Sequence, residues 1–233
     1  MVEKKLPSLS IFFPAYYDEH TIEGLTLRSI EAAKKLTDDY EIIIVDDHSP
    51  DRTGEIADRL AAEHPAVKAV HHDRNKGVGQ ALISGYANAS KEYVFYTDGD
   101  AQYDVDELQR LAEHAADYDL VIGYRLNRAE GPGRTLISRS FNLLVFLLFG
   151  IYYRDIDCSF KLVRRRILDG FRFRSDSGFT DAELVIRARR LKARIKEIGV
   201  HHHPRRFGSS RCMRTSLGLR ILKDMVRLRF EGH

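Results

Sequence analysis

Short apolar runs alternate with longer amphipathic stretches in the first half of the chain. Four runs are bounded by polar or glycine-rich segments: Leu9 to Phe13, Glu41 to Val45, Ala66 to His71 and Tyr93 to Thr97. Apolar residues recur at three- and four-residue spacing, as in amphipathic helices, over Thr21 to Leu36, Thr53 to Glu63 and Gly79 to Ala89. This alternation predicts βαβ units in an α/β fold of Rossmann-like type, with a mainly parallel sheet flanked by helices.

The polar segments that follow three of the runs hold most of the candidate chemistry. Ligands of open α/β sheets bind beyond the carboxyl ends of the strands. Acidic residues cluster there, in Pro14-Ala15-Tyr16-Tyr17-Asp18-Glu19, Asp46-Asp47-His48-Ser49-Pro50-Asp51 and Asp98-Gly99-Asp100-Ala101-Gln102. Helix capping and turn formation account for Ser49 or Asp51 alone, but they do not account for the clustering.

Asp98 and Asp100 flank Gly99, and carboxylates so close together repel each other unless a cation neutralises them. With the amide of Gln102 they form an all-oxygen ligand set, which suits Mg²⁺ or Mn²⁺. Such an ion also binds a diphosphate and offsets the charge on a leaving group. We therefore predict a metal site at Asp98, Asp100 and Gln102.

Composition indicates one domain with a substantial core, because 43% of the 233 residues are hydrophobic and no long Pro/Gly/Ser linker divides the chain. The formal net charge is +3, but basic residues dominate from Arg125 to Arg229. A basic half suits anionic ligands, although it is also common on surfaces without one. Two cysteines, Cys158 and Cys212, are too few for a disulfide framework and favour a reducing compartment.

Two segments are candidates for contact with a membrane. The longest apolar run, Phe141 to Tyr153, is shorter than the roughly 20 residues that span a bilayer. The tail from Leu217 to Phe230 places apolar residues at near-helical spacing with basic residues between them, which suits an interfacial helix. A helix packed against the domain, or a self-association surface, fits the same pattern. Met1 to Ser10 lacks the apolar region of a secretory signal.

The ordered set of motifs resembles the inverting family 2 glycosyltransferases, and within them the polyprenyl-phosphate (dolichol-phosphate) mannosyl- and glucosyltransferases. The matching segments run nearly end to end. They are Pro14-Ala15-Tyr16 with Glu19, Val45 to Thr53, Arg74 to Gly79 with Ala81 and Gly85, Asp98 to Gln102, Gly123 to Arg125, Asp157 to Lys161, and Arg205 to Arg211. The departures are Asp18 for the usual Asn, Asp-Gly-Asp for Asp-Ala-Asp, and Cys158-Ser159-Phe160 for Ser-Gly-Phe; none deletes a proposed ligand.

The resemblance implies a GT-A glycosyltransferase domain over residues 1–212 and an amphipathic basic helix over 213–233. It also implies site residues, which are carried over position by position. The donor nucleotide is expected at Pro14, Tyr16, Glu19, Val45, Asp47, Asp98 and Gly99, and the acceptor phosphate at Arg134, Ser138 and Arg205. Asp100, Arg125 and Arg205 are the expected catalytic residues.

The expected reaction transfers mannose or glucose, with inversion, from GDP-mannose or UDP-glucose to a polyprenyl or dolichyl phosphate. A phosphate acceptor is already anionic at neutral pH and needs no general base, so positively charged groups suffice to bind and orient it. Arg125, Arg134, Arg139 and Arg205, in loop-like contexts beside Gly or Pro, supply such groups.

Two alternatives remain open. A family 2 transferase acting on a glycan hydroxyl would need a base, for which Asp181 is placed, although acids at a helix start are also stabilising without catalytic duty. A non-catalytic nucleotide-sugar-binding scaffold would keep the fold and tolerate loss of Asp100. Nucleic acid is not an expected partner, because no binding motif or stacking platform accompanies the basic residues.

The expected location is cytoplasmic and peripheral, at the cytoplasmic face of a membrane, and a separate membrane subunit is a further expected partner. The run His201-His202-His203 is not read as a metal site, because adjacent strand residues point to opposite faces. It is expected to be a polar strand end that leads into Pro204.

Overall fold

The computed structural model describes residues 6–126, 132–205, 207 and 215–230, without the side chains of residues 132–134, 136 and 215–217. The first half alternates strands and helices: β1 (Leu9–Ala15), α1 (Ile22–Lys34), β2 (Tyr40–Asp46), α2 (Thr53–Glu63), β3 (Val67–His71), α3 (Val78–Asn88), β4 (Tyr93–Thr97), the 3₁₀ helix η1 (Val105–Glu107) and α4 (Leu108–Ala112). The second half contains β5 (Leu120–Arg125), α5 (Pro132–Phe149), β6 (Phe160–Arg164), α6 (Arg165–Asp169), α7 (Thr180–Arg190), β7 (Ile195–Val200) and α8 (Thr215–Phe230).

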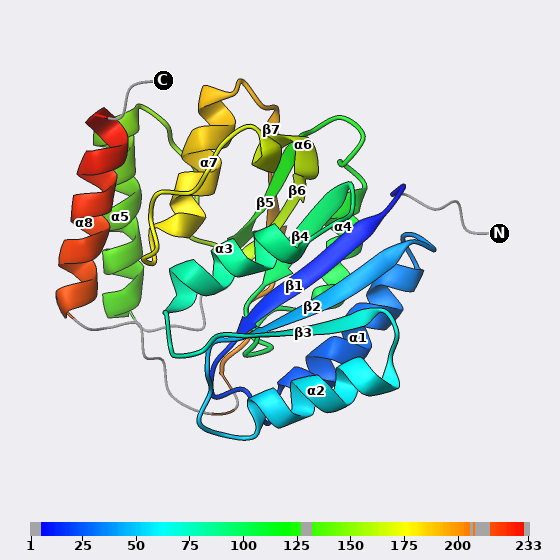
Figure 1. Cartoon of the computed structure of the whole chain (residues 1–233). Helices are drawn as coiled ribbons and strands as arrows, with labels where there is room; N and C mark the ends of the chain where they lie inside the picture. The colour runs from blue at the N-terminus through cyan, green and yellow to red at the C-terminus, as the bar shows by residue number, and fades with distance from the viewer. Residues whose placement is uncertain (1–5, 127–131, 206, 208–214, 231–233) are drawn as a thin grey trace.

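The strands within the described residues form one seven-stranded sheet in the order β3-β2-β1-β4-β6-β5-β7 (Figure 1). β1 pairs in parallel with both β2 and β4, β2 with β3, and β5 with β7. β6 is antiparallel to both of its neighbours, β4 and β5. The four strands expected from the apolar runs are therefore the parallel half of a mixed sheet.

Helices cover both faces of the sheet, and each face has its own hydrophobic core (Figure 1). α1, α2 and α4 pack on one face, while α3, α5, α6, α7 and α8 pack on the other. The apolar runs read from the sequence supply both cores, because alternate residues of a strand face opposite sides. In β1, Ile11 joins the first core and Phe12 joins the second.

The run Phe141 to Tyr153 is the carboxyl half of α5 and the segment that follows it. Helix α5 starts at Pro132, so Arg134 and Arg139 are helical residues; the expectation that they lie in loop-like contexts is wrong. Proline fits the first turn of a helix, where its missing N–H is not needed. The helix stops before Gly150, which has a φ of 68° that suits glycine at a helix end.

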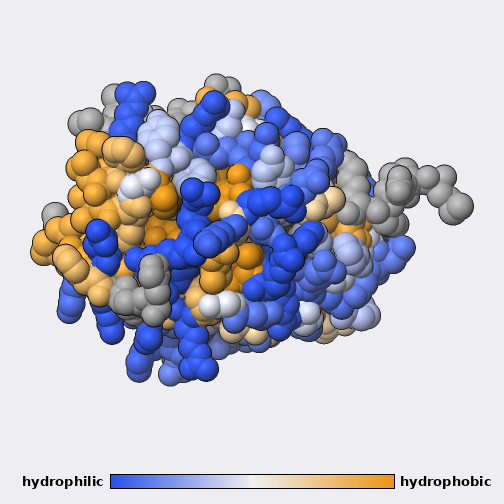
Figure 2. All heavy atoms as spheres, turned by 90° about the horizontal axis from the view of Figure 1, so that it is seen from above, coloured by the Kyte–Doolittle hydropathy of each residue, from blue (hydrophilic) through white to orange (hydrophobic). Residues whose placement is uncertain are grey.

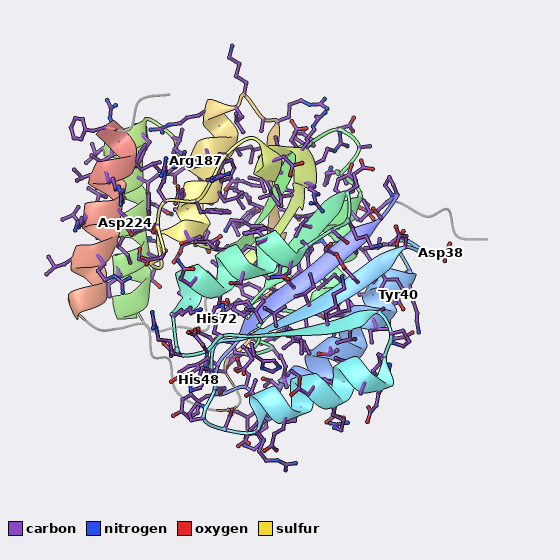
Figure 3. All side chains as sticks on the ribbon, in the orientation of Figure 1. Asp38, Tyr40, His48, His72, Arg187 and Asp224 are labelled. Atoms are coloured by element: carbon purple, nitrogen blue, oxygen red, sulfur yellow. The ribbon has the colours of Figure 1, made fainter. Side chains whose placement is uncertain are left out.

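Helix α8 packs beside α5 (Figure 1) and contributes Met225 and Leu228 to the core. It is also tied to the segment that precedes α7, because the hydroxyls of Ser175 and Ser177 both donate to Asp224 Oδ2 at 2.7 Å. Figure 3 shows Asp224 on the side of α8 that faces this segment. No helix in the described part of the chain is long and apolar enough to cross a membrane.

Candidate active site at the carboxyl edge of the sheet

The three polar segments singled out from the sequence meet at one edge of the sheet. β1 lies between β2 and β4, and all three run in the same direction, so their carboxyl ends coincide. Backbone hydrogen bonds join the segments, since Asp47 N donates to Ala15 O at 3.0 Å and Gly99 N donates to Pro14 O at 3.2 Å. The β1 end thus holds the other two segments in place.

Gly99 allows the segment that follows β4 to lie very close to the end of β1. A Cβ at this position would lie 2.7 Å from Pro14 O and 2.9 Å from a carboxylate oxygen of Asp18. The hydroxyl of Thr21 donates to Gly99 O at 2.8 Å and fixes the segment from the other side. The aspartates on either side of Gly99 are therefore held against the β1 end, and a side chain at 99 would force the two segments apart.

Asp18, Asp98 and Asp100 form an acidic group, in which the charge of Asp100 acts on the other two carboxyls. Burial raises the pKa of Asp18 to about 7, and the charge of Asp100 adds to this effect. Burial also raises the pKa of Asp98 to about 8, again helped by the charge of Asp100. The sequence places Asp18 among the clustered acids and as a departure from the family's usual Asn, without a ligand role; its burial and the effect of the Asp100 charge on its pKa make it part of the group.

This donor set fits Mg²⁺ or Mn²⁺. The carboxylates offer only oxygen ligands, and a divalent cation would remove the repulsion that keeps them from ionising. Asp98 and Asp100 are the residues that would hold the ion. The described residues contain no cluster of three or more His, Cys, Asp or Glu side chains arranged around a metal position. The side-chain nitrogen of Gln102 donates to His203 O at 2.9 Å, and its role as a ligand stays a prediction.

Arg205 reaches this acidic group from the far end of the sequence. Its Nη2 lies 2.5 Å from Asp100 Oδ2, and the pair is partly buried, with 29% of the arginine side chain and 10% of the aspartate side chain exposed. Two residues predicted to be catalytic are therefore brought together.

The residues predicted to hold the nucleoside lie around the same edge in different environments. Pro14 and Tyr16 are half-buried at the end of β1, with the Tyr16 ring edge-on to that of Tyr17. Glu19 accepts a hydrogen bond from Arg52 N at 3.1 Å. Val45 is fully buried, so its side chain packs in the core of the sheet.

Asp47, also predicted to contact the nucleoside, is the centre of a network that sequence analysis missed. Its carboxylate accepts the backbone N–H groups of Lys76 and Gly77, both at 2.8 Å, and is 2.6 Å from His72 Nδ1. His72 Nε2 lies 2.8 Å from the hydroxyl of Ser84 on α3. Gly77 takes a φ of 87° just before α3 begins.

Figure 3 shows His72 at the same end of the sheet as His48, which follows β2. The signal for this network was His71-His72 at the end of the third apolar run, directly across from Asp46-Asp47 in a parallel pair.

Arg125, predicted to be catalytic, ends β5 in a two-contact ion pair with Asp155. Its Nε and Nη2 donate to the two carboxylate oxygens at 2.6 and 2.8 Å. Hydrogen bonding and the charge of Asp155 raise the pKa of this guanidinium despite the opposing effect of its burial. Asp155 was not among the predicted residues, and its separation of 30 positions from Arg125 hides the pairing from sequence patterns.

A cavity of about 1000 Å³ lies beside Arg125. Its lining combines arginines with apolar side chains: Arg125, Leu126, Thr135, Arg139, Asn142, Leu143, Phe146, Tyr152 and Arg154. The Arg154 guanidinium stacks over the Tyr124 ring, 4.6 Å from its centroid. Within the described part of the chain, neither Arg139 nor Arg154 has a carboxylate partner, so the cavity presents two uncompensated cations.

None of the predicted acceptor residues is among the described side chains that line this cavity, and Arg205 contacts Asp100 instead. Ser138 is on α5, and its buried hydroxyl has no hydrogen-bond partner among the described residues; the same holds for the side-chain oxygen of Asn142, one turn along. Arg134 lies in the first turn of α5, and its side chain is outside the described part of the structure. Arg206 and residues 208–211, which belong to the last matching motif, also fall outside it.

Comparison with known families decides the class of protein. The model of the family described as Glycosyl transferase family 2 matches residues 10–172. This chain belongs to glycosyl transferase family 2. The match covers the three polar segments, Arg125 with Asp155, and the whole of the sheet except β7.

Two similar curated proteins illustrate the range of family 2 relatives. An undecaprenyl-phosphate 4-deoxy-4-formamido-L-arabinose transferase from Pseudomonas fluorescens is 34% identical over 206 residues, which is 87% of this chain and 59% of that protein. Glycosyltransferase AglD from Haloferax volcanii is 32% identical over 221 residues, which is 91% of this chain and 35% of AglD. This family 2 chain thus spans only part of the length of these relatives.

The fold has close parallels among solved glycosyltransferases. Glucosyl-3-phosphoglycerate synthase from Mycobacterium tuberculosis, in a complex with Mn²⁺, UDP and phosphoglyceric acid, superposes with a TM-score of 0.74 at 18% identity. The match covers 97% of this chain and 80% of the synthase. The GT-A fold expected from the sequence is therefore confirmed, with a mixed, mainly parallel sheet flanked by helices.

Asp181, the candidate base for a hydroxyl acceptor, is already engaged in this family 2 chain. Its Oδ1 lies 2.6 Å from the Nζ of Lys161, which is completely buried and also donates to Cys158 O at 2.6 Å. The neighbouring Glu183 accepts from Arg174 N, Ser175 N and Arg187 Nε. Glu183 is thereby assigned to holding the segment before α7.

The histidine run follows the strand end, as expected from the sequence. β7 ends at Val200; His201 N and Nδ1 both bond to Glu107, and His202 forms an isolated bridge with Tyr103. His203 N donates to Gln102 O at 2.8 Å. These contacts fasten the end of β7 to the segment that follows Asp100.

Proposed function

We propose that this chain is an inverting glycosyltransferase that moves a hexose, mannose or glucose, from a nucleotide-diphosphate sugar to a polyprenyl phosphate. The observation that carries the proposal is the cavity beside Arg125, in which the guanidinium groups of Arg139 and Arg154 and apolar side chains line the same space. A polyprenyl phosphate has a matching chemistry, with an anionic head and an apolar chain. The relatives named as undecaprenyl-phosphate transferases support this acceptor.

The acidic group is the proposed donor end of the site. Asp98 and Asp100 would hold Mg²⁺ or Mn²⁺, with Gln102 as the third predicted ligand. When bound, this ion would neutralise the diphosphate and stabilise it as the leaving group. Pro14, Tyr16, Glu19, Val45, Asp47 and Gly99 are the residues proposed to surround the nucleotide of GDP-mannose or UDP-glucose.

Arg125 connects the donor and acceptor ends. It lines the cavity, and its charge opposes the burial that raises the pKa of Asp157 to about 7. Burial and the charge of Asp100 raise the pKa of Asp98, and the charge of Asp157 adds to this effect. The phosphate head would therefore lie near Arg125, with Arg134, Ser138 and Arg205 as its further predicted contacts. An acceptor phosphate is ionised at neutral pH, so transfer needs orientation by cations rather than a base. The ion pair of Asp181 with Lys161 agrees with a site that needs none.

The apolar end of the cavity continues into an exposed hydrophobic surface, visible at the left of Figure 2, on the side where α5 and α8 lie. Its exposed apolar residues are Ile137, Leu143, Phe146, Leu147, Leu219, Leu222, Val226 and Phe230. Basic residues of α8, among them Arg220, Lys223 and Arg227, are exposed beside them. Apolar groups with basic neighbours suit anionic headgroups, so we propose peripheral contact at the cytoplasmic face of a membrane, with room for a separate membrane subunit.

The direct test is transfer by the purified protein. With Mn²⁺, labelled GDP-mannose or UDP-glucose and a polyprenyl phosphate, we expect a labelled lipid product, and transfer to oligosaccharide hydroxyls should be absent. Arg139→Gln and Arg154→Gln should each raise KM for the lipid phosphate about tenfold, the scale of one charge-assisted hydrogen bond. Arg166→Gln, an exposed arginine paired with Asp119 far from the cavity, is the matched control.

Two outcomes would redirect the proposal. Transfer to a glycan hydroxyl that Asp181→Asn abolishes, with folding intact by circular dichroism, would favour the alternative acceptor. If the affinity for the donor is unchanged by chelators and by Asp100→Asn, a non-catalytic scaffold is favoured.

A further inference from the structure

We propose that Arg205 is the internal counter-cation of the donor site, and that it competes with the divalent ion for Asp100. The inference rests on the proposed donor site, and it adds an order in which the ion and the acceptor bind. While Arg205 neutralises Asp100 it is not available to the acceptor phosphate, and it becomes available when the ion takes its place. Binding of the ion with its nucleotide would then precede productive binding of the acceptor.

The first support is the contact itself. Arg205 Nη2 lies 2.5 Å from Asp100 Oδ2, while the other oxygen, Oδ1, accepts the backbone N–H of Gln102 at 3.1 Å. Both oxygens of this predicted metal ligand therefore already accept a hydrogen bond. Asp18 also feels the charge of Arg205, which lowers its pKa against the larger effect of burial. Arg205 thus acts on two of the three carboxylates, Asp100 and Asp18.

The second support is that backbone pairing brings Arg205 to Asp100, although the two residues are 105 positions apart in the sequence. Gln102 and His203 exchange two hydrogen bonds, from His203 N to Gln102 O and from Gln102 Nε2 to His203 O. Tyr103 and His202 form an antiparallel bridge directly beside them, with the two rings 4.9 Å apart. These contacts place Arg205 two residues beyond a paired segment, so its reach to Asp100 follows from backbone pairing rather than from a chance surface encounter.

Electrostatics makes the two occupants exclusive. A divalent cation on Asp100 would share a carboxylate with a guanidinium at hydrogen-bonding distance, and like charges that close repel strongly in a partly buried site. The divalent ion carries twice the charge of Arg205, so it neutralises the neighbouring Asp98 and Asp18 more fully. Arg205 would therefore move off Asp100, and a phosphate is the anion that a freed guanidinium binds best.

The test measures Mn²⁺ binding alone, by isothermal titration calorimetry, with no nucleotide and no acceptor. Removing the competitor should tighten binding, so Arg205→Gln should bind Mn²⁺ about fivefold more tightly than the wild type, the scale of a partly exposed ion pair. Arg205→Lys keeps the charge and should stay within about twofold of the wild type. Arg166→Gln, which removes an equal charge elsewhere, should leave the affinity unchanged.

Thermal unfolding of each variant without metal checks that the fold is kept. Equal or weaker Mn²⁺ binding by Arg205→Gln, or no binding by any variant, would overturn the inference. The proposed function is judged separately, by whether a nucleotide diphosphate with Mn²⁺ raises the melting temperature of the wild type. A wild type that passes this second test while Arg205→Gln shows no gain in Mn²⁺ affinity would refute the competition and leave the transferase proposal standing.

Discussion

Asp18 and Asp98 show how a binding site lowers the stability of the protein that carries it. Folding buries both carboxylates and raises their pKa values to about 7 and about 8. Between about pH 4 and pH 8 the folded chain therefore holds protons that the unfolded chain has lost, and stability falls as the pH rises through this range. Glu41 acts in the opposite sense at lower pH, because hydrogen bonds from Lys68 and Ser10 outweigh its burial and lower its pKa to about 2.

Asp18→Asn tests the loss of folding stability caused by the buried Asp18 carboxylate. At pH 8 without metal, the variant should be more stable than the wild type by on the order of 2 kcal/mol, because it removes a buried charge while its side-chain oxygen still accepts from Tyr16 N. At pH 4 the two proteins should be equally stable. Urea unfolding at both pH values measures the difference, with the exposed Asp169→Asn as control. A variant that is no more stable than the wild type at pH 8 would contradict the assignment.

The buried pair of Lys161 and Asp181 gives a second prediction at this scale. Asp181→Ala leaves a completely buried ammonium group without its partner and should cost about 3–5 kcal/mol of folding stability. The double variant Lys161→Met with Asp181→Leu should recover most of that loss, because neither charge remains. Denaturant unfolding of the single and double variants checks this. If the costs of Lys161→Met and of Asp181→Leu, each measured alone, simply add in the double variant, the pair is not coupled.

The site residues could be predicted from the sequence only where they follow a strand. Asp98, Asp100 and Asp47 were found because an apolar run marks the strand end next to them. The ion pairs around the site could not be found this way. Arg205 meets Asp100, Asp155 meets Arg125 and Lys161 meets Asp181 across 105, 30 and 20 positions of the chain, and no local pattern encodes which of these contacts forms.

At the scale of the elements, the parallel half of the sheet was predictable and the mixed half was not. β1 to β4 and α1 to α3 repeat one rhythm of short apolar runs and amphipathic stretches, so local periodicity locates them. β6 pairs antiparallel between β4 and β5, and its order in the sheet depends on long-range contacts. The start of α5 was misread because Pro132 and Gly133 are typical of turns as well as of a first helical turn.

Packing between α3 and β1 yields a prediction about glycine. A Cβ on Gly85 would lie 2.1 Å from the ring of Phe12, which is fully buried and also packs edge-on against Tyr86. Gly85→Ala should therefore destabilise the protein by about 1–3 kcal/mol, since the helix and strand must separate. Gly24→Ala on α1, where nothing lies within 4 Å, is the matched control and should be neutral or stabilising by up to about 1 kcal/mol. Equal melting temperatures for the two variants would rule out this close contact.

The whole molecule places its polar chemistry and its exposed apolar surface side by side. Helix α5 forms one wall of the cavity beside Arg125 and also contributes to the apolar surface seen at the left of Figure 2. An acceptor whose head reacts while its chain stays in lipid would need this arrangement. Sequence analysis anticipated the two apolar segments, but it left open whether the tail packs on the domain. α8 does both, because Met225 and Leu228 are buried while Leu219 and Phe230 are exposed.

Vesicle binding tests the surface. The wild type should float with vesicles that contain anionic phospholipid and bind neutral vesicles less, because basic side chains of α8 neighbour the apolar ones. Leu147→Asp and Leu219→Asp should each weaken this binding severalfold, since both side chains are about 70% exposed and a charge there opposes insertion. Leu27→Asp, on α1 at the opposite face of the sheet, is the control. Equal flotation of all three variants would exclude this surface as the membrane contact.

The most direct measurement is the melting temperature of the protein with GDP and with UDP, each with Mn²⁺ and with a chelator. A ligand that binds only the native state raises its apparent stability. If Asp98 and Asp100 hold a cation that grips a diphosphate, one of the two nucleotides should raise the melting temperature with Mn²⁺ by several degrees, and neither the chelated wild type nor Asp100→Asn should respond. A nucleotide response that persists in the chelator, or in Asp100→Asn with Mn²⁺ present, would contradict the metal-dependent site.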